Sequence, residues 1–467
     1  MQGILRRVYE GLPQALRRMV CRLPYAWLAG QGYRRTLRLC RRLDLMSRSD
    51  VIAFQKRQLA ALLEFAVREV PFYESLRNVV MRLDPFDALR EFPLLSKEDV
   101  QRDFERMIPR SIRRIAHRER TTGGSSGNQL RFLEDDSTYA REMGFMHSQW
   151  ARVGYTTRSK KATFRGAEFR RYGDSVLWQE NPLHNELQFS PFHMNEGTLG
   201  LYVKKVAEYR PEFLHGYPSA IDVLAEYVIR HGLEARVQPI KAVLLGSEGC
   251  MSEQRDRIEG AFAARVYTFY GQSERVVLGG ECEWSQAYHA FPAYGVLEIV
   301  REDGSRCCEG EQGEIVGSGF LNRSMPLIRY RTDDQAVREP FLCKCGRCWD
   351  RFSNVQGRRA VEGFVVGRSG SKITATALNM HGDVFRNVVR YQYRQSIPGQ
   401  LVIRVIPSAA YSSTDEERII AAHGRKLWGE MDVLVEIVRD IPLTSSGKQR
   451  RIVSEIVTGD VLESGDR

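Results

Sequence analysis

The sequence contains no apolar run close to the ~20 residues that a membrane-spanning helix needs. Its first residues, MQGILRRVYEGLPQALRRMV, are interrupted by arginines and lack the apolar core of a signal peptide. Acidic residues are scarce in this region, since the first 48 residues hold eleven arginines but only Glu10 and Asp44. These absences argue against a membrane-spanning or secreted protein, and we expect a cytoplasmic one.

Internal repeats, low-complexity tracts and nucleic-acid reader motifs are also missing. The net charge of +11 and the pI of about 9.2 suit nucleic acid, anionic lipid or small anions equally. Without a reader motif, we expect no nucleic-acid partner. Residues 1–48 form a basic amphipathic pattern, with leucines from Leu5 to Leu23 at helical spacing. This pattern favours helices packed on the protein's own core; the alternative is peripheral contact with the inner face of a membrane.

Cysteine is used unevenly, and this favours a metal site. Six of the nine cysteines fall in the second half of the chain beyond residue 280, and clustered cysteines in a cytoplasmic protein suggest metal more than disulfides. The segments ECEWSQAYH and LCKCGRC supply enough ligands for a tetrahedral zinc site. We predict Cys282, His289, Cys343 and Cys345, with Cys348 as an alternative to either of the last two. Reduced thiols on neighbouring loops are the competing interpretation.

The length of 467 residues fits two or three domains. Strand and helix alternate in the middle of the chain: KAVLLG (241–246), a helix from Ser252, and RVYTFYG (265–271). GVLEIV (295–300) and GEIVGSG (313–319) indicate a hairpin. We therefore predict a large α/β domain whose β-sheets are flanked by helices.

The last part of the chain has elements of its own: a strand at 401–407, a helix at 417–428 and a strand at 433–441. They predict a small α+β domain; its mobility is implied only by the resemblance described below. The resulting division is a basic helical leader (1–50), a large domain (51–356) that begins with an amphipathic helix over 51–70, and a small domain (357–467).

Five segments carry polar residues suited to nucleotide chemistry. TTGGSSGNQ (121–129) is either a flexible turn or a loop whose backbone N–H groups surround a phosphate. LLGSEG (244–249) and YTFYGQSE (267–274) each place small residues and a carboxylate after an apolar strand. LIRYRTDD (327–334) ends in two acids, and LTSSGKQR (443–450) places a lysine on a Gly/Ser loop. Carboxylate oxygens suit Mg²⁺ or ribose hydroxyls, and an ammonium stabilises charge on a phosphate under attack.

In this order, the segments resemble the adenylate-forming superfamily of acyl-CoA ligases. The resemblance is strongest to the phenylacetate-CoA ligase-like branch with its CapK-type proteins, which are associated with polysaccharide gene clusters. It covers residues 50–455 approximately. It implies that the protein activates a small-molecule carboxylic acid with ATP and Mg²⁺ to an acyl-adenylate, rotates the C-terminal domain and transfers the acyl group to CoA. The Cys-x-Cys-Gly-Arg run also resembles the branch that carries structural zinc.

The resemblance implies a role for each matching residue. The catalytic residues are Lys448, Glu274 (the Mg²⁺ ligand) and Arg358. The acyl pocket includes Tyr217 and Pro218 of HGYPSA, where Ser219 is separately expected to cap the following helix. The ATP-binding residues are Thr122, Gly123, Gly124, Ser125, Ser126, Gly127, Gly246, Ser247, Glu248, Tyr270, Gly271, Ser273 and Asp334.

Two departures from the family pattern leave alternatives open. Asp333 stands where the family usually has glycine, and Arg359, Ala360 and Val361 follow Arg358 where it usually has an aspartate pair. CoA transfer is therefore less supported than adenylation, and an amine, for example on an amino sugar of a surface polysaccharide, is an alternative acceptor. An alternative of another class is a catalytically inactive, zinc-stabilised basic protein that binds a membrane surface or nucleic acid.

Overall fold

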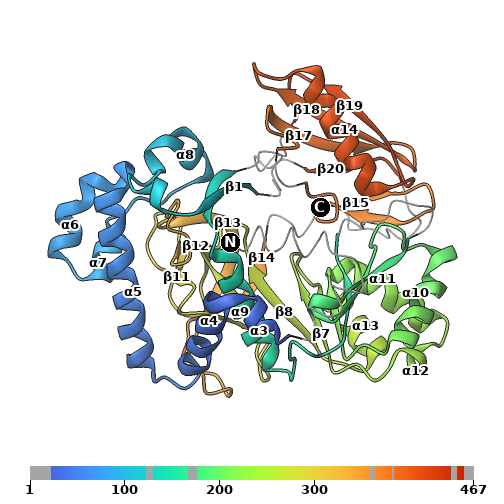
Figure 1. The fold of residues 1–467 in the computed structure, drawn as a ribbon, viewed down its shortest axis with the longest axis horizontal. Helices are drawn as coiled ribbons and strands as arrows, with labels where there is room; N and C mark the ends of the chain where they lie inside the picture. Colours follow the sequence, from blue (N-terminus) through green and yellow to red (C-terminus); the bar gives the residue numbers. More distant parts are fainter. Residues whose placement is uncertain are drawn as a thin grey trace.

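The computed structural model describes residues 23–122, 130–166, 176–357, 363–380, 383–442 and 450–456. Within these residues, twelve strands form one large mixed sheet with helices on both faces, and a four-stranded sheet lies in the C-terminal part (Figure 1). The predicted combination of an α/β domain and a small α+β domain is therefore confirmed. Within the same residues, no helix is both long enough and apolar enough to cross a membrane.

The large sheet has the strand order β11-β12-β13-β14-β10-β9-β8-β7-β6-β3-β5-β4. Strands β5, β3, β6, β7 and β8 pair in parallel, so their carboxyl ends meet along one side of the sheet. The predicted hairpin is present as the antiparallel pair β11–β12. The strands are β3 (Lys161–Phe164), β4 (Trp178–Asn181), β5 (Glu186–Phe189), β6 (Phe213–Gly216), β7 (Ala242–Gly246), β8 (Val266–Gly271), β9 (Leu278–Gly280), β10 (Tyr288–Ala290), β11 (Gly295–Val300), β12 (Gln312–Gly319), β13 (Tyr330–Glu339) and β14 (Arg351–Gln356).

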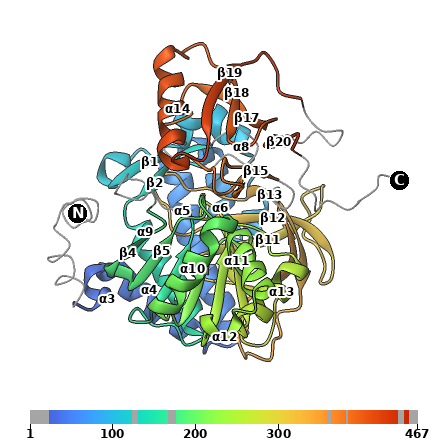
Figure 2. The ribbon, with the colours of Figure 1, turned by 90° about the vertical axis from the view of Figure 1, so that its right-hand side faces the viewer.

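Helices cover both faces of the parallel strands (Figure 2). Residues of α4 and α9 pack with Phe213 and Leu244 on one face, and residues of α10, α11 and α13 pack with Leu214 and Val243 on the other. Because both faces are buried, the central strand β7 is a continuous apolar run in sequence. The helices are α3 (Tyr25–Leu28), α4 (Gly30–Leu43), α5 (Arg48–Glu69), α6 (Arg77–Arg82), α7 (Pro85–Arg90), α8 (Lys97–Arg102), α9 (Thr138–Ala151), α10 (Glu196–Tyr209), α11 (Pro218–Arg230), α12 (Glu234–Val237), α13 (Ser252–Phe262) and α14 (Ser413–Leu427).

The basic helix α4 packs on the protein's own core, as the favoured interpretation of the N-terminal pattern predicts. Tyr33 and Cys40 are buried, whereas Arg34 and Arg41 are exposed. The next helix, α5, begins earlier than predicted because the hydroxyl of Ser47 accepts a hydrogen bond from a backbone N–H of its first turn. Of the apolar residues that suggested the leader helix, those before residue 23 lie outside the described residues, and Leu23 is exposed and precedes the first described helix, so its predicted place on a packed helical face is wrong.

The C-terminal part combines a hairpin with a mixed sheet covered by α14. The hairpin strands are β15 (Phe364–Val366) and β16 (Lys372–Thr374); the sheet strands are β17 (Val388–Gln395), β18 (Gln400–Pro407), β19 (Asp432–Ile437) and β20 (Ile452–Ser454). The helix begins four residues before its predicted start because Ser412 and Asp415 form a capping box. Apolar side chains of this part continue into the core of the large domain. A domain boundary at 356/357 remains a prediction.

Candidate active site

Predicted site residues lie at the carboxyl ends of three adjacent parallel strands, on the same side of the sheet. Tyr217 follows β6, Ser247 follows β7, and Gly271 ends β8. Ligands of open α/β sheets bind at the carboxyl ends of such strands. Gly246 has no room for a side chain, since an added Cβ would lie 2.3 Å from the ring of Phe269. Ser247 has a φ of +72°, an uncommon conformation for a residue with a side chain.

The side chains of Tyr270 and Asp334 meet at the end of β8. The Tyr270 hydroxyl donates to Asp334 Oδ2 at 2.8 Å and accepts from Gln272 at 3.1 Å. Burial, and then the neighbouring Asp334 carboxylate, raise the pKa of Tyr270 well above its ordinary value, so Tyr270 remains a hydrogen-bond donor. Asp333 has a φ of +61°, which explains why glycine is usual there; aspartate is one of the few other residues that adopt this conformation.

Glu274 lies in the loop that follows β8 and faces β13. Its Oε1 accepts a hydrogen bond from the hydroxyl of Tyr330 at 3.0 Å, and its side chain is half-buried. Ser273, also half-buried, and exposed Gly271 precede it in the same turn. A carboxylate held in this way supplies the hard oxygen donor that Mg²⁺ prefers, so the residues fit the predicted metal.

Glu248 contacts two segments that are distant in sequence. Its Oε2 accepts from the hydroxyl of Ser219 at 2.7 Å, and its Oε1 accepts from the hydroxyl of Thr374 in β16 at 2.8 Å. The prediction that Ser219 caps α11 is wrong: Tyr217 is the N-cap residue and Pro218 is the first helical residue. Proline is common at that position because its fixed φ suits the helix start and the N–H it lacks has no intrahelical partner.

Arg165, at the carboxyl end of β3, was not predicted. Its Nη2 donates to Ser247 Oγ at 2.5 Å, its Nη1 donates to His215 Nε2 at 3.3 Å, and its guanidinium lies 5.4 Å from the centre of the Tyr217 ring. His215 Nδ1 donates to the Leu244 carbonyl at 2.8 Å, so this imidazole is neutral. Burial, and then Arg165, hold its pKa well below the ordinary value. A cation directly after a buried strand is a feature that sequence reasoning did not single out.

The glycine-rich loop is anchored at both ends. The backbone N–H of Thr122 donates to the Leu130 carbonyl at 2.9 Å, and the backbone N–H of Leu130 donates to the Thr122 hydroxyl at 3.0 Å. The strands before and after the loop, β1 (His117–Thr121) and β2 (Arg131–Asp135), form an antiparallel pair on the side of the large domain that faces the C-terminal part (Figure 1). Of the predicted site residues, Gly123, Gly124, Ser125, Ser126, Gly127, Arg358 and Lys448 lie outside the described residues.

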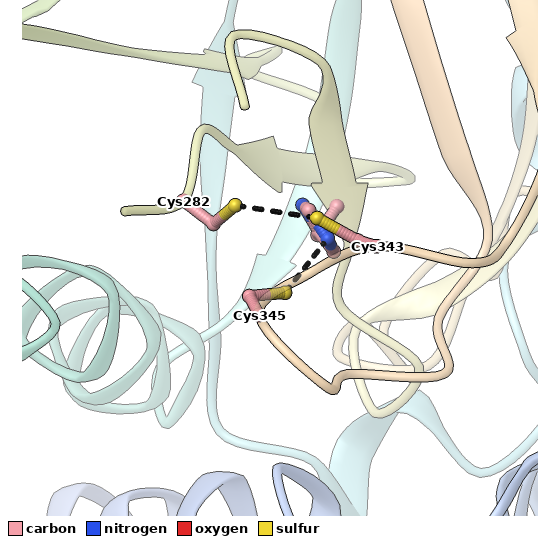
Figure 3. A group of neighbouring side chains, drawn as sticks. Cys282, Cys343 and Cys345 are labelled. Atoms are coloured by element: carbon pink, nitrogen blue, oxygen red, sulfur yellow. Dashed lines mark hydrogen bonds between the residues drawn. The ribbon is translucent and has the colours of Figure 1, made fainter. Parts of the chain in front are cut away.

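The four predicted zinc ligands lie together, with their ligand atoms all within 4.8 Å of one another (Figure 3). Cys282 Sγ is 3.7 Å from Cys343 Sγ, and Cys345 Sγ is 3.3 Å from His289 Nε2. Ligand atoms of a tetrahedral zinc site, with Zn–S distances of ~2.3 Å, lie roughly 3.5–3.8 Å apart. Cys348 is not part of this group: Gly346 turns the chain at a φ of +79°, and the Cys348 thiol faces the Gly346 carbonyl.

Arginines surround this cysteine–histidine cluster. All three side-chain nitrogens of buried Arg152 have no hydrogen-bond partner, although the guanidinium lies 3.6 Å from Asp44. Burial, followed by Arg152, Arg351 and Arg347, lowers the pKa of His289 to about 3, so the imidazole is neutral, as a ligand must be. A Zn²⁺ ion with three thiolates and an imidazole would carry one net negative charge, which these guanidinium groups would balance.

Comparison with known proteins agrees with this arrangement. Residues 365–455 match the family model of the CapK C-terminal domain. Protein CapK of Staphylococcus aureus is 23% identical over 429 residues, covering 87% of this chain and 90% of its own length. Phenylacetate-coenzyme A ligase of Thermus thermophilus is 25% identical over 337 residues, covering 68% and 72%.

A solved structure shares the fold over most of the chain. It is 2-hydroxyisobutyryl-CoA ligase in complex with 2-HIB-AMP and CoA, which covers 88% of this chain and 91% of its own with a TM-score of 0.56 and 18% identity. The C-terminal family match, the relatives along the chain and the common fold all support the superfamily of adenylate-forming ligases, and the chain is similar in sequence to CapK and the phenylacetate-CoA ligases.

Proposed function

We propose that this protein is an AMP-forming ligase that activates a carboxylic acid with ATP and transfers the acyl group to CoA. The observation that carries this proposal is that Tyr217, Ser247 and Tyr270 lie at the carboxyl ends of three adjacent parallel strands, with Asp334 of β13 hydrogen-bonded to Tyr270. The similarity to an acyl-CoA ligase supports the interpretation of this arrangement as the site of acid activation. The same relationship argues against a catalytically inactive basic protein, since Glu274 and Lys448 are both retained.

In this proposal each residue has a physical task. The loop after Thr122 surrounds the phosphates of ATP with backbone N–H groups, and Asp334 accepts hydrogen bonds from the ribose hydroxyls. Tyr270 keeps the Asp334 carboxylate in position through its hydroxyl. Glu274 would hold Mg²⁺, which offsets the negative charge of the phosphates when bound. Lys448 stabilises the charge that develops on the α-phosphate as the substrate carboxylate attacks and pyrophosphate leaves.

An amine is the second candidate acceptor. The similarity to CapK covers 87% of this chain, whereas that to the phenylacetate-CoA ligase covers 68%. The C-terminal residues match a CapK domain model, and the chain lacks the family's acids just after Arg358. The acids that are missing after Arg358 are expected to serve the second half-reaction, so their loss bears on the acceptor, whereas Lys448 of the adenylation step is present.

We also propose that Cys282, His289, Cys343 and Cys345 hold a structural Zn²⁺ ion. The ligand atoms already lie at distances suited to tetrahedral coordination, and all four positions are filled by protein. A closed site of this kind leaves no position for a substrate. Its role would be to tie the loop between β13 and β14 to the segment that follows β9.

The test of the main proposal is acid-dependent pyrophosphate release. The purified protein is incubated with ATP, Mg²⁺, hydroxylamine and pooled carboxylic acids, and hydroxamates are identified by mass. We expect pyrophosphate and one class of hydroxamate. The active acid is then offered with CoA or with amino sugars to identify the acceptor. Absence of both pyrophosphate release and ATP binding by calorimetry would contradict the proposal.

A further inference from the structure

The guanidinium of Arg165 is a half-buried cation with neutral partners. It donates to a serine hydroxyl and to a neutral imidazole, and Trp150 packs against the other side of that imidazole at 4.9 Å between ring centres. In the described part of the chain, no carboxylate oxygen lies within 4.0 Å of it. A cation withdrawn from water normally has an anionic partner, because desolvation is costly.

The other cation of the same strand has such a partner. Lys161, at the amino end of β3, lies 3.1 Å from Glu186 Oε2, and both side chains are almost fully buried. Thr163, Asn181 and Gln188 complete the hydrogen bonds of that carboxylate. Among the described residues, the cation at the amino end of β3 is therefore neutralised by a carboxylate, and the cation after its carboxyl end is not.

The guanidinium of Arg165 lies beside the acyl-pocket candidate Tyr217. In the sheet order β8-β7-β6-β3, the β3 backbone lies three strand spacings of ~4.8 Å, about 14 Å, from β8, and the Arg165 side chain extends from it across β6 to Ser247 at the end of β7. β8 leads into Glu274 and carries Tyr270, next to Asp334, the residues on the nucleotide side. Arg165 instead packs over Tyr217, the acyl-pocket candidate. The far end of an acid bound beside Tyr217 would therefore be within reach of this guanidinium.

We propose that the substrate is a dicarboxylic acid, whose second, non-reacting carboxylate binds the guanidinium of Arg165. This inference rests on the proposed ligase function and names the substrate class of that site. Guanidinium and carboxylate form paired, charge-assisted hydrogen bonds, which are stronger than those Arg165 makes to Ser247 and His215. Ser247, at its φ of +72°, holds the guanidinium until the ligand arrives.

The test uses pairs of acids that match in shape and differ in one charge: adipate with hexanoate, and terephthalate with 4-methylbenzoate. Binding to the full-length protein is measured by calorimetry in the presence of Mg²⁺ and a non-hydrolysable ATP analogue. Pyrophosphate release is measured in parallel with ATP. The variants are Arg165→Met and Arg165→Lys. The control is Arg158→Met, which removes an exposed arginine near the amino end of the same strand.

We expect the wild type to bind at least one dicarboxylate roughly tenfold or more tightly than its matched monocarboxylate, the value of one charged hydrogen-bonded contact. Arg165→Met should abolish this preference, Arg165→Lys should keep part of it, and Arg158→Met should keep all of it. The proposal would be overturned if both members of every pair bound equally or if no dicarboxylate bound. It would also be overturned if Arg165→Met lowered the affinity for dicarboxylates and monocarboxylates by the same factor. A dicarboxylate that binds through Arg165 without pyrophosphate release would contradict the ligase function alone.

Discussion

The two ends of the parallel strands differ in how their polar groups are satisfied. At the amino ends, Lys161 is paired with buried Glu186, and Arg265 at the start of β8 donates to the carbonyls around Cys282. At the carboxyl ends, Arg165, Tyr270 and Glu274 are half-buried and contact groups that a ligand can replace. The amino ends therefore stabilise the fold, and the carboxyl ends are available for chemistry. Substitutions at the two ends should consequently change different measurements.

The largest effect is expected for Lys448→Ala. Removing a cation that stabilises charge in the transition state should lower the adenylation rate by about 10³-fold. The midpoint of thermal unfolding should not change, because this effect belongs to the reaction rather than to the fold. Acid-dependent pyrophosphate release and circular dichroism measure the two quantities, with Lys204→Ala, an exposed lysine of α10, as control. Full activity of Lys448→Ala would show that another group performs this task.

Cys345→Ser should lower the stability of the fold and leave the adenylation rate of the folded protein unchanged. Loss of one zinc ligand is expected to release the ion and to lower the free energy of unfolding by roughly 4 kcal/mol. Adenylation per folded molecule should persist, since the cluster lies near the amino end of β8. Zinc content by mass spectrometry and denaturant unfolding are the measurements. Cys348→Ser is the matched control and should retain zinc; a zinc loss equal to that of Cys345→Ser would mean that Cys348 is a ligand.

Glu186→Gln should also destabilise the fold, and in a pH-dependent way. Burial raises the pKa of Glu186, but Lys161 and the nearby hydrogen bonds outweigh it and lower the value to about 2. The carboxylate therefore stabilises the fold above the ordinary glutamate pKa, and this contribution is lost as the pH falls toward 2. At pH 7 the variant should be about 3 kcal/mol less stable, because Lys161 remains buried without its partner.

The measurement is urea unfolding of both proteins between pH 7 and the lowest pH at which the wild type is folded. The difference in free energy should shrink below the ordinary glutamate pKa. A difference that stays constant with pH would mean that the Glu186 side chain acts through packing rather than through its charge. Arg165-dependent binding of dicarboxylates should be unchanged in this variant at pH 7.

The smallest effect is expected for Tyr270→Phe. The hydroxyl donates one hydrogen bond to Asp334, whereas the ring packs on Phe352 and remains in the variant. Loss of that hydrogen bond should raise the KM for ATP by roughly tenfold or less. The thermal midpoint should change little. A large fall in kcat with an unchanged KM would instead place Tyr270 near the reacting atoms.

Sequence reasoning predicted four strands of the large sheet (241–246, 265–271, 295–300 and 313–319) to within about one residue, and for a physical reason. β7 and β8 are apolar runs that end in glycine, so both their type and their ends are encoded locally. The members of the cysteine–histidine cluster were predicted because cysteine and histidine are scarce and clustered in this chain. The choice between Cys345 and Cys348 was not predictable, because it depends on the left-handed turn at Gly346.

The partners of the site residues could not be predicted in the same way. Glu248 receives hydrogen bonds from Ser219 and Thr374, which lie on separate elements and meet only in the folded chain. The contact between Arg165 and Ser247 likewise joins two strands with β6 between them. Local patterns identify residues that end strands, but the pairings across strands and between domains arise from tertiary packing.

The hydrogen bond from Thr374 to Glu248 has a thermodynamic consequence. Thr374 belongs to the residues that match the CapK C-terminal domain, so this bond can exist only while that domain lies against α11 and β7. Any ligand that binds the Glu248 carboxylate in place of Thr374 must weaken the contact between the C-terminal domain and the large domain. By reciprocity, docking weakens the binding of that ligand by the same factor. The docking of the C-terminal domain and the binding of a ligand to the Glu248 carboxylate are thus thermodynamically coupled.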